Sequence, residues 1–158
     1  MAIKNRPVGR LDGQTNFAAR EFVVTSGVTV NEGDFVYFAS GKVTNATVAG
    51  ARLIGMASGT ATGNAGGTVK VSVCIDPNMV YLVDNDNDTT TFAATHVGTN
   101  FDLIGAAGAQ LVDTSTTGTT GSLTCVEYNP QIDPVRTDTS WGLFVINESG
   151  LFTTSGGQ

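Results

Sequence analysis

The sequence predicts an all-β protein, a single small β-barrel or sandwich with an extended N-terminal arm and one short helix. Short runs of apolar and β-branched residues recur at intervals of about ten residues, with turn-forming residues between them. Charged residues make up only 14% of the chain, against about 25% in typical soluble domains. Low charge together with many β-branched residues favours sheet. It also leaves little surface charge to repel other protein chains, so we expect self-association or a large partner.

The 158 residues fit one domain, large enough to bury about 70% of its unfolded surface. We divide the chain into an arm, 1–20, and a β domain, 21–158. The arm carries +3, from four basic residues against one acidic residue, and the rest carries −9, from four against thirteen. The basic residues of the arm are Lys4, Arg6, Arg10 and Arg20.

The arm has two interpretations. Residues 5–16 contain Pro7, Gly9 and Gly13 and cannot readily fold alone. They are either a disordered terminus or an extended segment that orders on an acidic neighbour, and the ends 1–10 and 155–158 are expected to be loose. The acidic body argues against nucleic-acid binding, which depends on Lys and Arg. Without a long apolar run or a signal peptide pattern, we expect synthesis in a cytosol and no membrane segment.

The expected strands follow from apolar runs bounded by turn residues. The most regular is 68–75, where Val71 and Val73 share a dry face and Lys70, Ser72 and Cys74 share a wetter one. In chain order, the expected strands are 21–25, 34–39, 42–44, 52–57, 68–75, 79–83, 101–104, 109–113, 122–128, 142–146 and 151–154.

Two expected strands carry apolar side chains on both faces, so both of their faces must be buried. They are 35–38, with four consecutive large apolar residues, and 79–83, with five. For 35–38 we expect the core on one side and a neighbouring subunit on the other. A short helix is expected at 91–97, with Thr91 as N-cap and Gly98 in the left-handed conformation after its end. The Thr, Ser and Gly run 114–121 reads as a loop.

The order of motifs in the C-terminal half is distinctive. Val97 to Leu103 reads VGTNFDL, a further strand follows, and then come Thr116 to Thr119, TTGT, and Ser122-Leu123 before another strand. This succession resembles the capsid decoration (cement) proteins of tailed double-stranded DNA bacteriophages, while the N-terminal half is similar only in style. The resemblance implies a small all-β protein, commonly a homotrimer, that binds outside an icosahedral head and stiffens it against packaged DNA.

The resulting expectation is a noncatalytic structural protein of the virion, on the outer capsid surface, made in the host cytoplasm and needing no cofactor. Its partner would be the major capsid protein, whose neighbouring subunits it would bridge. We assign the capsid contact to Lys4, Arg6, Arg10 and Arg20. Contacts between subunits of the homotrimer are assigned to Phe35, Tyr37 and Trp141, the last of which could equally anchor the core.

The sequence offers weak motifs for ion binding. The loop 59–67, GTATGNAGG, lacks the Lys-Ser/Thr pair and helix of a P-loop, so a flexible hairpin loop is the better interpretation. Asp84, Asp86 and Asp88 alternate like the start of a calcium loop, but Thr89 and Thr95 stand where an EF-hand needs Gly and Glu. A solvated acidic turn is favoured, and the three carboxylates remain a weak calcium candidate.

Three residues could take part in catalysis, metal binding or redox chemistry, but none has the further residues that such a site needs. His96 is the only histidine and fits a packing or capping residue, because no nucleophile motif or further ligand accompanies it. Cys74 and Cys125 have no Cys-x-x-Cys motif, so we expect reduced, half-buried thiols, with a disulfide open only if adjacent strands carry them.

Two other classes of function stay open. A carbohydrate- or receptor-binding module displayed on a virion would need an aromatic platform, for which Tyr81, Tyr128 and Trp141 are available. A small hydrolase would need His96 beside a carboxylate. Scattered acidic residues and a single histidine make catalysis the weaker hypothesis.

Overall fold

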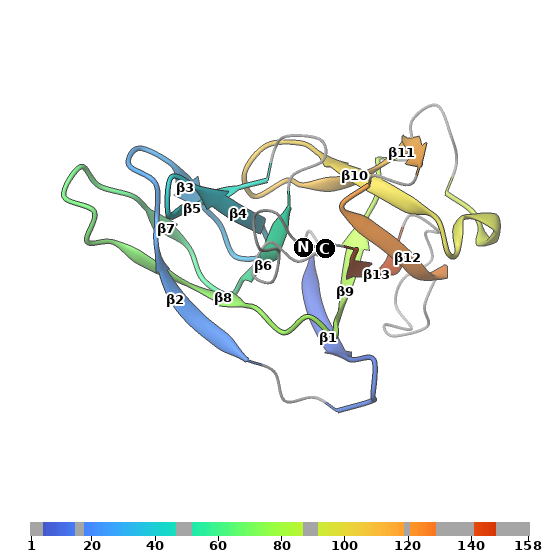
Figure 1. The fold of residues 1–158 in the computed structure, drawn as a ribbon. Helices are drawn as coiled ribbons and strands as arrows, with labels where there is room; N and C mark the ends of the chain where they lie inside the picture. Colours follow the sequence, from blue (N-terminus) through green and yellow to red (C-terminus); the bar gives the residue numbers. More distant parts are fainter. Residues whose placement is uncertain are drawn as a thin grey trace, which may run out of the picture.

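The computed structural model describes residues 5–14, 18–46, 52–86, 92–118, 121–128 and 141–147. These residues form antiparallel strands and one short 3-10 helix, so the all-β prediction is confirmed (Figure 1). Two curled sheets pack together as in a sandwich, and the described strands close no barrel. The expected strand 151–154 and the predicted cap Thr91 lie outside the described residues.

Sheet A has six strands in the order β1-β9-β13-β12-β10-β11. A parallel bridge joins Val112 of the last strand to Asn85, which follows β9, so the sheet curls back on itself. Its members are β1 (Arg6–Arg10), β9 (Met79–Asp84), β10 (Asn100–Ile104), β11 (Leu111–Gly118), β12 (Leu123–Tyr128) and β13 (Trp141–Ile146).

Sheet B has five strands in the order β2-β8-β6-β4-β5 and also curls, because Val24, just after β2, bridges to Val43 of β5. A separate two-stranded ladder joins β3 (Thr29–Val30) to β7 (Ala61–Thr62). The members of sheet B are β2 (Ala19–Val23), β4 (Phe35–Ala39), β5 (Lys42–Asn45), β6 (Leu53–Ala57) and β8 (Lys70–Cys74).

The main core lies between the two sheets, which occupy opposite sides of the molecule in Figure 1. It is rich in aromatic residues. Its buried members from sheet B and the end of β5 are Phe35, Ala46, Leu53, Met56 and Cys74. Those from sheet A and the segment before η1 are Met79, Tyr81, Val83, Phe92, Phe101, Leu103, Val112, Leu123, Cys125 and Phe144.

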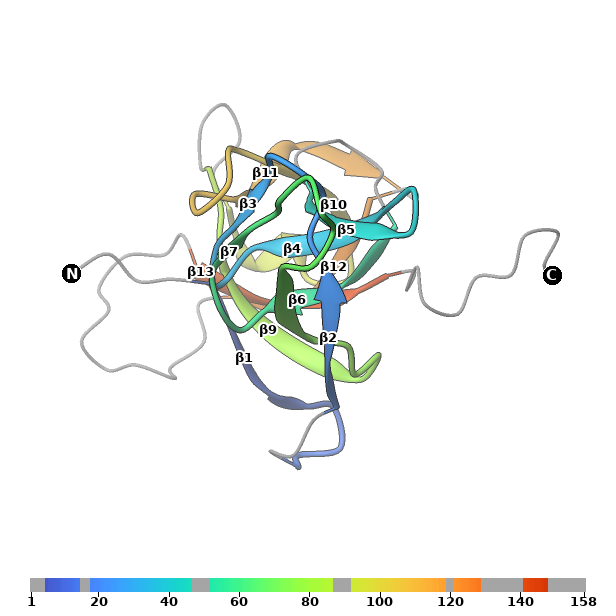
Figure 2. The same ribbon diagram turned by 90° about the vertical axis from the view of Figure 1, so that its left-hand side faces the viewer.

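A second core fills the inside of curled sheet B, the end of the molecule that faces the viewer in Figure 2. None of its buried members in the described part of the chain is aromatic, and all five strands of the sheet or their ends contribute to it. Its buried members are Val24, Val30, Val36, Val43, Ile54, Ala57, Val71 and Val73.

Strand β4 serves both cores because successive side chains point to opposite faces. Phe35 and Tyr37 pack on the main core, while Val36 between them belongs to the second. At Phe35 and Val36 the chain itself covers both faces, but the expectation fails at Phe38, which is 39% exposed. Phe35 is fully buried, with its ring centroid 5.0 Å from that of Tyr81, so its assignment to a subunit interface was wrong.

The N-terminal arm was expected to be loose or to order on a partner, and the structure differs. Strand β1 pairs with β9, from Arg6 opposite Leu82 to Arg10 opposite Met79. Pro7 is tolerated because β1 is an edge strand, and the register shift between Pro7 and Gly9 is a β-bulge. The predicted division between 1–20 and 21–158 falls inside β2.

Two further predictions need adjustment. Strand β11 runs on to Gly118 through the Thr-rich stretch expected to be a loop, in keeping with the strand propensity of Thr. The short helix is η1, a 3-10 helix of only Ala94–His96, whose N-cap is Ala93. Gly98 has the expected left-handed conformation, with φ of 85°. None of the described helical residues forms a helix long and apolar enough to cross a membrane.

Gln110 fastens sheet A to sheet B. Its side-chain oxygen accepts the N–H of Phe35 at 2.6 Å, and its amide nitrogen donates to the carbonyl oxygens of Phe35 at 3.1 Å and Ala46 at 3.0 Å. The backbone carbonyl of Gln110 accepts from the Asn5 side chain at 2.8 Å. The buried amide therefore takes the place of a strand partner for the start of β4.

Asp34 makes a second link between the sheets. Its carboxylate accepts the N–H of Asn31 at 2.9 Å within its own turn and the N–H of Gly108 at 2.7 Å from the turn between β10 and β11. The side chain is buried, and this burial raises the pKa of the Asp34 carboxyl from its ordinary value, although the two N–H groups oppose the shift.

Candidate functional site

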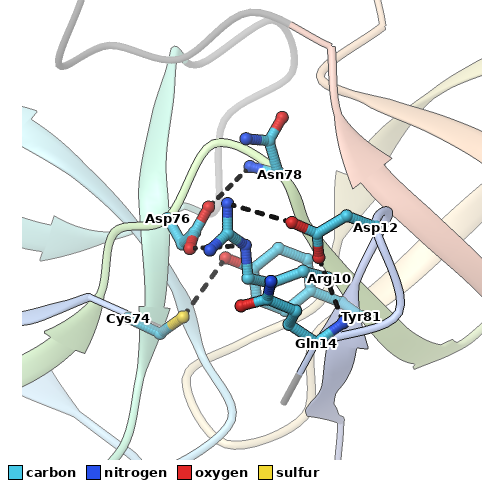
Figure 3. Close-up of polar contacts among 7 residues, drawn as sticks. All are labelled: Arg10, Asp12, Gln14, Cys74, Asp76, Asn78 and Tyr81. Carbon is cyan, nitrogen blue, oxygen red and sulfur yellow. Dashed lines mark hydrogen bonds and ion pairs between the residues drawn. The ribbon is translucent and has the colours of Figure 1, made fainter. Parts of the chain in front are cut away.

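The most developed polar cluster surrounds Arg10 at the end of β1 (Figure 3). Nε of Arg10 lies 3.2 Å from Oδ2 of Asp76, and a terminal guanidinium nitrogen lies 3.5 Å from Oδ2 of Asp12. The Asp76 side chain is only 8% exposed. Arg10 was predicted to contact a capsid; these internal ion pairs hold its side chain, which is 26% exposed, and the capsid contact stays a prediction.

Backbone hydrogen bonds make the surroundings of Arg10 rigid. The N–H of Leu11 donates to the carbonyl of Asn78, and the N–H of Gly13 donates to the carbonyl of Arg10. Asp76 accepts the N–H of Asn78 at 2.9 Å in the turn between β8 and β9. Because β8 belongs to sheet B and β9 to sheet A, the cluster ties β1 to the crossover between the sheets.

Beneath this cluster, the Tyr81 hydroxyl donates to Sγ of Cys74 at 3.9 Å (Figure 3). Both side chains are fully buried, and desolvation raises the pKa of the Cys74 thiol and that of the Tyr81 phenol. A nucleophilic cysteine needs the opposite shift, because the thiolate is the reactive form. This pair therefore packs the core as neutral groups.

Cys125 is equally buried, and burial raises its pKa to about 11. The two cysteines are unpaired, as expected, and their strands β8 and β12 belong to different sheets. The expectation that they would be half-buried was wrong, because both thiols point into the main core.

The other predicted capsid contacts are accessible where they are described. Arg6 and Arg20 are exposed, on the edge strand of sheet A and on that of sheet B. Both views show β1 and β2 at the lower side of the molecule, which brings the two edges to the same side (Figures 1 and 2). Lys4 lies outside the described residues.

The residues assigned to subunit contacts are mostly internal. Tyr37 is half-buried against the main core. Trp141 is 4% exposed and packs with Val80, Leu82 and Leu143 on the outer face of sheet A. Trp141 is therefore a packing anchor, the second of the two roles considered for it, rather than an accessible contact.

The acidic turn does not gather its carboxylates into a metal site within the described part of the chain. Asp86 turns toward β11, where one oxygen accepts both the N–H of Thr114 at 3.0 Å and its hydroxyl at 2.7 Å. Asp84 accepts the N–H of Asn85 at 2.9 Å. Asp88 lies outside the described residues, so the calcium candidate stays a prediction.

His96 occupies the last position of η1 and has a clear packing and capping role. Its Nδ1 accepts the N–H of Ala93 at 3.0 Å. Its ring stacks on Phe92 with centroids 5.6 Å apart and meets the edge of Phe101 at the same distance. These contacts agree with the favoured interpretation of this residue.

The structure bears on the binding alternative as well. Tyr81 and Trp141, two of the three aromatic residues available for a carbohydrate platform, are buried, and Tyr128 packs against Phe92 with centroids 5.4 Å apart. These three side chains do not form an exposed aromatic surface. The hydrolase alternative, which needs His96 beside a carboxylate, stays a prediction. Among the described residues, no group of three His, Cys, Asp or Glu could hold a metal ion.

Sequence reasoning missed the residues that join the sheets: Asp34, Asp76 and Gln110. Asp76 had a usable signal, because Asp followed by Pro77 and Asn78 after a regular strand is a turn pattern in which Asp caps the backbone. Gln110 had none, since its partners lie 64 and 75 residues away.

A scan against protein-family models gave no match to this chain, and a search of curated proteins likewise found none.

Proposed function

We propose that this protein is a noncatalytic capsid decoration protein, which binds as a homotrimer across neighbouring major capsid subunits on the outside of a phage head. Adhesion is its mechanism. Shell subunits could not separate without also breaking the contacts to the bridging protein. Three copies joined together would convert a weak single contact into strong attachment through effective concentration.

The observation that carries the proposal is the pairing of the segments in which the resemblance resides. Strand β10, within VGTNFDL, lies between the strands of the other two motifs. Asn100 is opposite Gly118 on one side and Thr124 on the other. Phe101 is opposite Thr117 and Leu123. Motifs that are short and separate in sequence therefore form one continuous unit of sheet A.

The accessible cations supply the candidate contact. Arg6 is the first residue of edge strand β1 and Arg20 lies near the start of edge strand β2, and both side chains are exposed. Arg10 is neutralised internally by Asp12 and Asp76, so it adds no free positive charge. An acidic capsid surface would be drawn to the two exposed guanidinium groups, with Lys4 as a third candidate.

Co-sedimentation with expanded, empty heads of tailed phages tests the proposal. Deleting 1–20 would remove β1 and part of β2, so charge reversal by Arg6→Glu with Arg20→Glu is the cleaner change. Lys42→Glu with Lys70→Glu, on β5 and β8, matches it in net charge. We expect stoichiometric pelleting of the wild type and the control and loss for the Arg6 and Arg20 variant.

Two results would contradict this scheme at different levels. If the folded wild type pelleted with none of the heads, the decoration function would fail. If all three proteins pelleted equally, decoration would stand but the contact would lie elsewhere than Arg6 and Arg20.

A further inference from the structure

The single histidine occupies an unusual position at the rim of the main core. In a capping box, a side chain at the third helical position accepts the N–H of the N-cap residue, and Glu or Gln normally supplies it. Here His96 takes that position, with Nδ1 3.0 Å from the N–H of Ala93. In return, the N–H of His96 donates to the carbonyl of Ala93 at 3.0 Å.

This hydrogen bond exists only while the imidazole is neutral. A backbone N–H can only donate, so Nδ1 must be the unprotonated nitrogen and Nε2 carries the hydrogen. Protonation would make both ring nitrogens donors and set two N–H groups against each other. The bond caps a turn of just three residues, whose own backbone hydrogen bonds are those from the N–H of His96 to Ala93 and from the N–H of Val97 to Ala94.

The turn matters because it holds Phe92 in place. Phe92 is 1% exposed, and its ring stacks on that of His96 with an interplanar angle of 5°. The same ring contacts Phe101, Tyr128 and Phe144. A Cβ on Gly142 would lie 2.8 Å from the Phe92 ring, so the backbone of β13 leaves room for it.

We infer that His96 is an acid-sensitive latch: when its imidazole becomes protonated, η1 loses its cap, and the segment that carries Phe92 loosens from the rim of the main core. Below the rim, the end of the segment stays tied to β12, because the N–H of Gly98 donates to the carbonyl of Cys125 and the N–H of Cys125 donates to the carbonyl of Thr99. Opening would thus be local, and the inference does not depend on the proposed function.

Among the described residues, few other titratable groups lie around the latch. On β10, Asp102 follows Phe101, which contacts His96, so it points to the opposite face. On β12, Glu127 precedes Tyr128 and is exposed. Cys125 stays a neutral thiol, with its pKa near 11, and β13 carries no ionisable side chain.

Amide hydrogen exchange measured by NMR tests the latch, with protection factors compared between pH 8 and pH 5. Across this range an ordinary histidine changes its charge. For the wild type, we expect the protection of the Ala93 amide to fall about fivefold at pH 5, the usual net value of one hydrogen bond. His96→Gln is the matched control, because a Gln side chain at this position can accept the same N–H at any pH.

Protection that falls in the wild type but not in His96→Gln would support the latch. Protection that does not change in the wild type although the His96 ring signals titrate would overturn it. An equal fall in both proteins would also overturn it, since another group would then be responsible. If the Gln variant does not fold, the ring nitrogen shifts decide: at pH 8 they must report hydrogen on Nε2, and hydrogen on Nδ1 would refute the inference.

Discussion

The two cores of this protein are built from different residues, although they share strands. The main core between the sheets is aromatic, with Phe35, Tyr81, Phe92, Phe101 and Phe144 buried in it. The second core, inside curled sheet B, is built from Val, Ile and Ala as far as its described buried members go. The contrast follows from the space available, because rings need the wide gap between two sheets, whereas a tightly curled sheet admits only short branched side chains.

The comparison shows that a single strand can meet two different packing requirements. In β4 the order Phe35, Val36, Tyr37 alternates a ring, a branched aliphatic and a ring. The two cores also depend differently on polar groups. Gln110 and Asp34 join the two sheets beside the main core. Gln110 lies in the β10–β11 connection and binds Phe35, whereas Asp34 lies at the start of β4 and binds Gly108.

Phe101→Ala should produce the largest effect and separate the two cores most clearly. Its ring is fully buried among Phe92, His96 and Phe144, so its loss should lower the free energy of unfolding by about 3–5 kcal/mol. Val36→Ala in the second core should cost about 2 kcal/mol, from two buried methyl groups. Urea denaturation measures both, and an equal cost would refute the proposed difference between the cores.

Gln110→Leu tests the fastening between sheets. The change is close in volume, but it leaves the buried N–H of Phe35 without its acceptor and the Ala46 carbonyl without the donor that Gln110 supplies, while the Phe35 carbonyl still accepts the N–H of Ala46 at 2.8 Å. Each unsatisfied buried group costs about 1–3 kcal/mol, so we expect a loss of roughly 3 kcal/mol. Thermal unfolding would show this as a lower Tm. A Tm unchanged from the wild type would mean that Gln110 does not fasten the sheets.

Asp34→Asn should produce the smallest effect, visible in pH dependence. Burial raises the pKa of Asp34 above its ordinary value of 3.8, so the folded state binds its proton more tightly than the unfolded state. The contribution of Asp34 to stability must therefore decrease as the pH rises from below 3.8 through the raised pKa, and then stay constant.

The measurement is the free energy of unfolding of the wild type minus that of the Asp34→Asn variant, followed from pH 3 to pH 8. We expect this difference to fall with rising pH and then level off. A difference that increased with pH would mean that the hydrogen bonds from Asn31 and Gly108 outweigh the burial of the carboxylate.

Much of the fold follows from local patterns. Val71 and Val73 on one face of β8, against Lys70 and Ser72, mark a strand with one dry face, and both valines are buried. Cys74 breaks the pattern, because the face of β8 that is wet at Lys70 becomes the main core at its other end. Period-two alternation describes a strand, but it cannot say where along the strand a second sheet begins to cover it.

The candidate site was predicted less well. Charge counting placed Arg10 with Arg6 and Arg20, yet Arg10 pairs with Asp76, 66 positions later in the chain, and only the other two are exposed. His96 was expected to pack or cap, and it does both. His96 just before a left-handed Gly98 indicates the end of a short helix. The direction in which its Nδ1 points depends on the positions of Phe92 and Phe101, which the local sequence does not give.

The sequence by itself determined the class of the fold, the positions of most strands and the left-handed turn at Gly98. These depend on backbone preference and on residue periods that act within a few positions. The tertiary structure decided that the arm joins sheet A as β1, that Phe35 and Trp141 are internal, and that Gln110, Asp34 and Asp76 hold the sheets together. Those outcomes depend on which distant groups meet, because a buried donor or charge must find its partner wherever the folded chain places one.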